Sequence, residues 1–135
     1  MNLEAVMEEI AENLRTITSV AGRTFGFPPS SITPPAAIVG YPEVKFDQTY
    51  GRGFDRWTVP VWVVVGKVDD RNARTLLSPY LSGTGNASVK AALDDGTYVE
   101  CDSVTVVSAT VTQMEIAADP YLAAEFSVDV VGSGE

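Results

Sequence analysis

The sequence predicts an α+β fold, in which an antiparallel-leaning mixed sheet packs against an N-terminal helix and two shorter helices on one face. Three observations lead to this prediction. Apolar residues recur at helical spacing over residues 3–17. Strand-like stretches follow, and two short helical segments interrupt them. The last third of the chain is rich in Val and Thr and alternates with the period of a strand.

The N-terminal helix is the clearest element, and we expect it to pack on the sheet of its own domain. Its acidic residues lie largely off one apolar stripe, which consists of Leu3, Val6, Met7, Ile10, Leu14 and Ile17. The segment FGFPPSSITPP at 25–35 then holds four prolines, which favour an extended crossing. A ligand for proline-binding domains is the alternative interpretation of that segment.

Three extended pieces follow the crossing. Residues 36–41 read as a short strand that ends at Pro42, and residues 43–50 read as a second extended piece. Glycines in YGRG at 50–53 allow a turn or hinge, so the strand at 55–65 is expected to form a long hairpin with the preceding piece.

The strand at 55–65 is apolar on both faces. Four valines point one way, while Pro60, Trp62 and Val64 point the other way. The domain's own helices can cover the valine face. Because a bare second face would be adhesive, we expect a neighbouring subunit to cover it, and Trp62→Asp to disturb subunit association more than folding. Pro60 cannot donate to a ladder, which predicts a strand edge or a bulge.

Two short helices come next. The first is expected to begin at Asp69 or Asp70, and Pro79 should distort or stop its last turn. The second covers residues 88–93 and closes at a DDG turn.

The C-terminal third reads as strands. A slip in the apolar phase near Ser103 and Val104 predicts a bulge or bend in the first of them. In the last strand, apolar residues occupy every second position over 122–130, which indicates one buried face and one solvent-exposed face.

The composition is that of an ordinary globular protein, and we expect one domain over residues 1–135 with a flexible tail at 131–135. Of the residues, 45% are hydrophobic and 20% are charged. The net charge of −9 argues against tight binding to a nucleic acid backbone. Acids among the apolar N-terminal residues argue against a signal peptide, and no run is apolar enough to span a membrane.

Few residues point to catalysis, and we expect no enzyme, no cofactor and no metal. The chain has no histidine, so Ser-His-Asp and Cys-His arrangements cannot form. The lone Cys101 excludes an internal disulfide and reads as a small buried hydrophobe. The pairs Asp69-Asp70 and Asp94-Asp95 leave an Asp-based metal hydrolase as an alternative, although they also suit helix caps and turns.

A cationic, aromatic stretch favours an interaction protein instead. YGRGFDRW at 50–57 mixes two arginines with three aromatic residues, and both kinds are enriched at protein interfaces. Together with the second face of the strand, it predicts an interface made of Tyr50, Arg52, Phe54, Arg56, Pro60, Trp62 and Val64.

Several motifs are similar to those of one protein family. They are LEAVMEEIAENL, TPPAAIVGYP, TYGRGFDRWTVPVWVVVG, the D-R-x-A-R helix start at Asp70 to Arg74, and the closing VDVVGSG. Over nearly all 135 residues the chain resembles the small tail-terminator proteins of long-tailed actinobacterial phages, which are also labelled head-to-tail connector or neck proteins.

The resemblance implies a structural role in the tail or neck of a virion that is assembled in the cytoplasm of a bacterial host. Such proteins form a ring, commonly a hexamer, on the last layer of the tail tube. The ring stops tube polymerisation and presents a surface to the DNA-filled head. The implied partners are further copies of the chain, the tail tube protein and a head-completion protein. Genomic DNA would pass through the lumen without specific binding.

Two further readings stay open beside the terminator and the metal hydrolase. The chain can be a neighbouring head-completion or neck connector protein. It can also be a monomeric module that captures an extended peptide along an open sheet edge.

Overall fold

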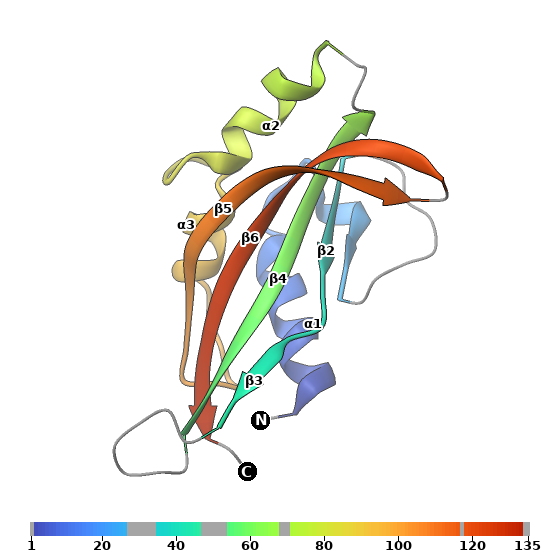
Figure 1. Cartoon of the computed structure of the whole chain (residues 1–135). Coiled ribbons are helices and arrows are strands. Elements are labelled where there is room, and N and C mark those ends of the chain that lie inside the picture. Colours follow the sequence, from blue (N-terminus) through green and yellow to red (C-terminus); the bar gives the residue numbers. More distant parts are fainter. Residues whose placement is uncertain (1, 27–34, 47–53, 68–70, 117, 134–135) are drawn as a thin grey trace.

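The computed structural model describes residues 2–26, 35–46, 54–67, 71–116 and 118–133. Within these ranges a six-stranded mixed sheet carries the helices (Figure 1). The elements in chain order are α1 Leu3–Leu14, η1 Ala21–Arg23, β1 Thr24–Phe25, β2 Ala36–Val39, β3 Glu43–Lys45, β4 Phe54–Lys67, α2 Ala73–Leu81, α3 Val89–Asp94, β5 Ser103–Ile116 and β6 Asp119–Ser133. This architecture confirms the α+β fold class. The YGRG hinge, Asp69, Asp70 and most of the proline-rich crossing lie outside the described residues.

The strand order is β1-β2-β4-β6-β5, with β3 beside β4 as well. β1 runs parallel to β2, and the other described pairings are antiparallel. The long central pairing joins β4 to β6, from Phe54 opposite Ser133 to Lys67 opposite Tyr121. Within the described residues, the expected hairpin is seen as the antiparallel pairing of Glu43–Lys45 in β3 with residues 56–58 of β4.

Helix α1 begins at a side-chain cap and ends earlier than predicted. The Oδ1 atom of Asn2 accepts a hydrogen bond from the N–H of Ala5 at 2.9 Å. The helix stops at Leu14, where a run of β-branched residues, Thr16 to Thr18, follows and disfavours further turns. Ile17 is still buried, so the apolar stripe continues although the helix does not.

The three helices cover one face of the sheet, which we call the inner face. Alternate residues of β4, from Val59 to Val65, form a single buried cluster with residues of α1, α2 and α3. Val106, Phe126 and Val128 extend this cluster across β5 and β6. The expectation of helices on one face is therefore confirmed, and Figure 1 shows α1 lying behind the strands.

The opposite, outer face has a smaller cluster of its own, and here one sequence expectation is wrong. Val64 is fully buried within the single chain, next to Ile38 and Ala123, so no neighbouring subunit is needed to cover it. The physical reason is that β4 is a central strand. Its cross-strand partners in β2 and β6 place their side chains on both sides of Val64, which the period of one strand cannot reveal.

Trp62 adds to this outer cluster by lying over a glycine. A Cβ atom on Gly40 would come within 2.8 Å of both the Trp62 ring and Cγ of Pro60. Only glycine therefore lets the indole pack this closely against the backbone, and Trp62 is left half-buried. The N–H of Gly40 donates to the carbonyl of Pro60 at 2.7 Å.

The prediction of a strand edge or a bulge at Pro60 is wrong. It lies inside β4 opposite Ser127, at the level where β2 has ended at Val39 and β3 has not begun. In an antiparallel ladder, the N–H and C=O of one residue point to the same neighbour. The nitrogen of Pro60, which carries no hydrogen, thus faces the gap between β2 and β3. No residue of β2 or β3 lies there that would need a hydrogen bond from it.

The C-terminal strands differ from the prediction at two points. The irregularity in β5 lies between Val106 and Ser108, a few residues after the expected position. There the Oδ1 atom of Asp94 accepts a hydrogen bond from the N–H of Val106 at 2.8 Å, which ties the irregular stretch to α3. In addition, the expected flexible tail is partly wrong, because β6 continues to Ser133 and pairs with the start of β4.

The segment before β5 is tied to α1 by side chains. The carboxylate of Glu9 accepts hydrogen bonds from the N–H groups of Val99, at 2.7 Å, and Glu100, at 3.1 Å. The amide of Asn13 donates to the carbonyl of Thr97 and accepts from its N–H. These contacts place Cys101, which follows Glu100, close to the carboxylate of Glu9.

Candidate functional site

The described part of the predicted interface lies on the outer face of β4. Arg56 is exposed, Pro60 and Trp62 are half-buried, and Val64 is buried. Phe54 begins β4, while Tyr50 and Arg52 lie outside the described residues. The structure therefore brings Pro60 and Trp62 together as partly exposed side chains, and it leaves Val64 no surface for a partner.

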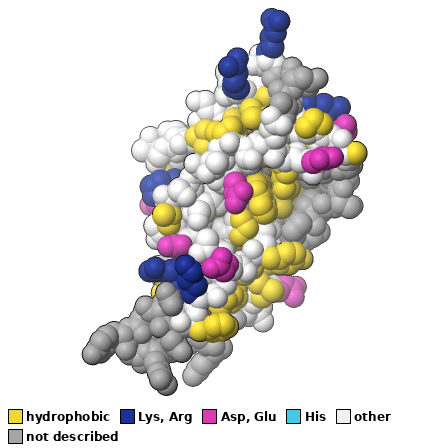
Figure 2. Space-filling view, in the orientation of Figure 1, with side chains coloured by type: hydrophobic (Ala, Val, Ile, Leu, Met, Phe, Trp, Pro, Cys, Tyr) yellow, Lys and Arg dark blue, Asp and Glu magenta, His cyan; other side chains and the backbone are white. Residues whose placement is uncertain are grey.

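A shallow concavity of about 210 Å³ lies beside these residues, and we call it the outer-face patch. It is lined by Tyr41, Glu43, Thr58, Pro60, Glu125 and Ser127. Tyr41 is 64% exposed. Glu43 and Glu125 are exposed and form no ion pair with any described residue. Figure 2 shows hydrophobic and acidic side chains interspersed along this side of the molecule.

Of the six residues that line the outer-face patch, the sequence predicted only Pro60. Tyr41 follows the end of β2, Glu43 begins β3, and Glu125 on β6 lies directly opposite Trp62. The alternation of β6 indicates that Glu125 faces solvent, but only the strand pairing shows that it faces the same way as Trp62.

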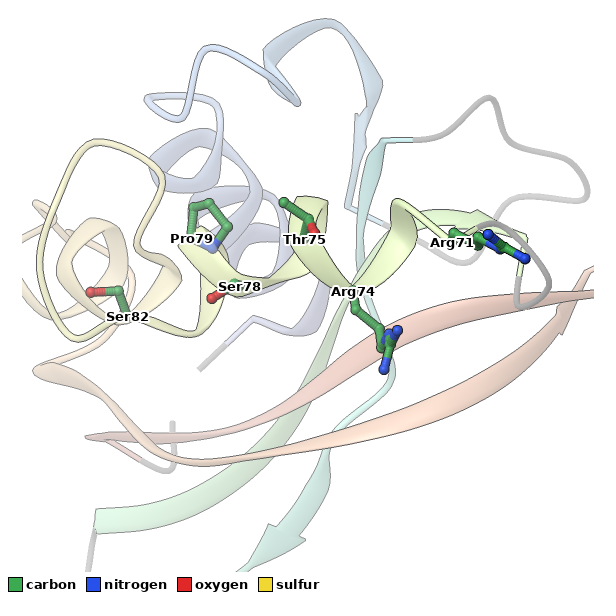
Figure 3. Close-up of a pocket in the computed structure, with 6 residues that line it drawn as sticks. All are labelled: Arg71, Arg74, Thr75, Ser78, Pro79 and Ser82. Carbon is green, nitrogen blue, oxygen red and sulfur yellow. The ribbon is translucent and has the colours of Figure 1, made fainter.

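A second concavity, of about 680 Å³, runs along the solvent side of α2, and we call it the α2 patch (Figure 3). It is lined by Arg71, Arg74, Thr75, Ser78, Pro79 and Ser82. Both arginines are exposed, form no ion pair with a described residue and extend away from the helix in different directions. Basic side chains also project at the upper end of the molecule in Figure 2.

The sequence of α2 explains why this patch is polar. Ala73, Leu77 and Tyr80 face the core at helical spacing, which turns the arginines and serines outward. The hydroxyl of Tyr80 lies 2.6 Å from Oγ of Ser19 and anchors the buried side. Pro79 remains inside the helix rather than ending it, and its missing N–H leaves the carbonyl of Thr75 without its usual donor.

The candidate catalytic and metal residues do not form a reactive site within the described ranges. No group of three or more His, Cys, Asp or Glu residues could hold a metal ion there. Asp94 binds the N–H of Val106 and the ammonium of Lys90. Asp95 is exposed at the end of α3, and the pair Asp69-Asp70 lies outside the description.

No family model matches the chain, and a search of curated proteins finds no significant match. Among the described residues, the helices are too short or too polar to cross a membrane.

Cys101 should be a poor nucleophile. Burial raises the pKa of its thiol to about 11, and Glu9, Asp102 and Glu100 add to the effect. At pH 8 we therefore expect iodoacetamide to alkylate it about 100-fold more slowly than an exposed cysteine, since the thiolate is the reactive form. The stabilisation that follows from the raised pKa is present below the unfolded thiol's ordinary pKa and is lost as pH rises toward 11.

The alkylation rate is read by mass spectrometry across a pH series. In denaturing urea the same thiol should react like a free cysteine, which serves as the internal control. Equal rates for the folded and the denatured chain would contradict this assignment.

Proposed function

We propose that this chain is a structural protein of a phage virion, which caps the tail tube as a ring and forms the joint to the DNA-filled head. The motif resemblance suggests the phage role. The single structural observation that supports it is a pair of unlike surfaces, the α2 patch on the helical side of the sheet and the outer-face patch on the other. A closed ring of identical subunits needs two such different, mutually complementary surfaces.

The finer features of the proposal follow from the same role. The ring is commonly a hexamer in proteins of this kind, with the tail tube protein below it and a head-completion protein above it. The net charge of −9 suits a lumen through which DNA slides, because like charges prevent the phosphates from adhering. No cofactor or catalysis is required.

A deletion of the gene tests the proposed function. Lysates of the deletion phage should contain overlong tail tubes and separate DNA-filled heads in negative-stain electron microscopy, and expression of this chain from a plasmid should restore joined particles. Tails of normal length attached to heads would refute the terminator role. Tubes of normal length beside leaking or unattached heads would favour the neighbouring neck protein instead.

One observation favours a second candidate function, a monomeric peptide-binding module. β5 spans 14 residues and, among the described strands, pairs only with β6. Its sequence contains no Pro, Lys or Arg to block an added strand. Val107 and Val111 are 60% and 53% exposed on this edge strand. A module of this kind should stay monomeric and bind extended peptides saturably, with β5 amides becoming protected from hydrogen exchange.

A further inference from the structure

The two patches carry opposite charge on opposite sides of the sheet. The α2 patch presents Arg71 and Arg74 on the helical side of the sheet, whereas the outer-face patch presents Glu43 and Glu125 on the face opposite the described helices. None of these four side chains has an ion-pair partner among the described residues. Each patch therefore has unpaired charge that a partner of the opposite sign can neutralise.

The total charge limits which surfaces of two copies can meet. Each copy carries 18 acidic and nine basic residues, so two copies repel each other except where a basic surface meets an acidic one. Two of the nine basic residues lie together on the α2 patch. Lys45 and Arg56 form a cross-strand pair on the outer face, beyond the end of the outer-face patch.

Each patch also supplies apolar surface, which a stable contact needs beside its charges. On α2, Leu76 is 51% and Leu81 is 39% exposed. On the outer face, Tyr41 projects beside half-buried Pro60 and Trp62. An exposed tyrosine of this kind can enter a shallow groove and stack on an arginine side chain.

We propose that a second copy of this chain occupies the α2 patch, with its outer-face patch turned toward Arg71 and Arg74. Glu43 and Glu125 of that copy face the two arginines, and its Tyr41 enters the concavity along α2. The contact joins unlike surfaces, so it repeats head to tail from copy to copy. The proposal rests on the proposed function in one respect, which is that copies of the chain assemble.

The acidic side of α1 is a weaker partner for the arginines. Glu4, Glu8 and Glu12 follow one line along this helix, but Glu8 already pairs with Arg15 at 2.9 Å. The line includes no exposed aromatic residue. It also belongs to the helical side of the sheet, as α2 does.

Charge reversal tests the contact in the full chain. One variant carries Arg71→Glu and Arg74→Glu, and a second carries Glu43→Arg and Glu125→Arg. The native chain is expected to assemble in sedimentation velocity at low ionic strength, or in cosedimentation with tail tubes, and each variant alone should lose this assembly. An equimolar mixture should regain assembly with a 1:1 composition, because each variant then offers the other an opposite charge.

A matched control carries Glu4→Arg and Glu12→Arg, which change the net charge as much as the second variant does and should leave assembly unchanged. Circular dichroism verifies that each variant is folded.

If both reversal variants assemble like the native chain, or if their mixture stays monomeric, the contact is wrong although the proposed function stands. If the native chain stays monomeric with and without tubes, the proposed function fails too. If the arginine variant loses only binding to a labelled DNA duplex, the α2 patch serves nucleic acid and the proposal is overturned.

Discussion

Phe126→Ala should lower the free energy of unfolding by about 3–5 kcal/mol. Phe126 is 2% exposed and lies in the inner cluster, where β4 and β5 place Val61 and Ala109 opposite it. Removing the ring loses the stabilisation from its burial. It also leaves a cavity in the core, which β6 cannot close easily because it is paired with a strand on each side. Because a small domain has only about 5–15 kcal/mol of stability in total, this one change brings it close to unfolding.

Urea denaturation, followed by far-UV circular dichroism, measures the effect. Leu76→Ala is a suitable control, because it also truncates a large apolar residue, but one that is 51% exposed. The control should cost less than about 1 kcal/mol. A similar loss for both variants would mean that Phe126 is not part of the packed core.

Trp62→Asp should destabilise the isolated chain by about 2–4 kcal/mol, the second-largest effect we expect. The indole packs on Gly40 and joins Val64 and Ile38 in the outer cluster. A carboxylate at this position exposes that cluster and stands directly opposite Glu125. The sequence alone suggested that this change would disturb association more than folding, and the contact with Gly40 revises that expectation.

Trp62→Phe provides the comparison, since it keeps an aromatic ring over Gly40 and adds no charge. Thermal unfolding of both variants should show a small shift for Phe and a large one for Asp. Because Trp57 is buried on the inner face, its fluorescence should remain shielded in folded Trp62→Asp. An Asp variant as stable as the native chain would show that the outer cluster contributes little.

The inner layer was predictable because it depends on local periodicity. The stripe of α1 and the alternating valines of β4 each identify their buried face without knowledge of a neighbour. The length of β6 was underestimated, because its final residues are held by the start of β4 rather than by their own pattern.

The outer face was less predictable because it depends on which strands are neighbours. The alternation within β4 correctly placed Pro60 and Trp62 on one face, but it could not show that Ile38 and Ala123 would enclose Val64. Tyr41 and Glu43 come from one part of the chain and Glu125 from another, and only the sheet brings them together. Arg71 and Arg74 were visible as a helix-start motif, whereas their exposure depends on how α2 docks.

The pairing order also has a kinetic consequence. β5 and β6 are consecutive, so their ladder can close within microseconds, as hairpins do. The other edge of β6 must wait for β4, whose residues are separated from it by both short helices. Such distant closure is slow in folding chains. We therefore expect the β5–β6 ladder to form before the β4–β6 ladder, so that one edge of β6 stays open to other chains until β4 joins the sheet.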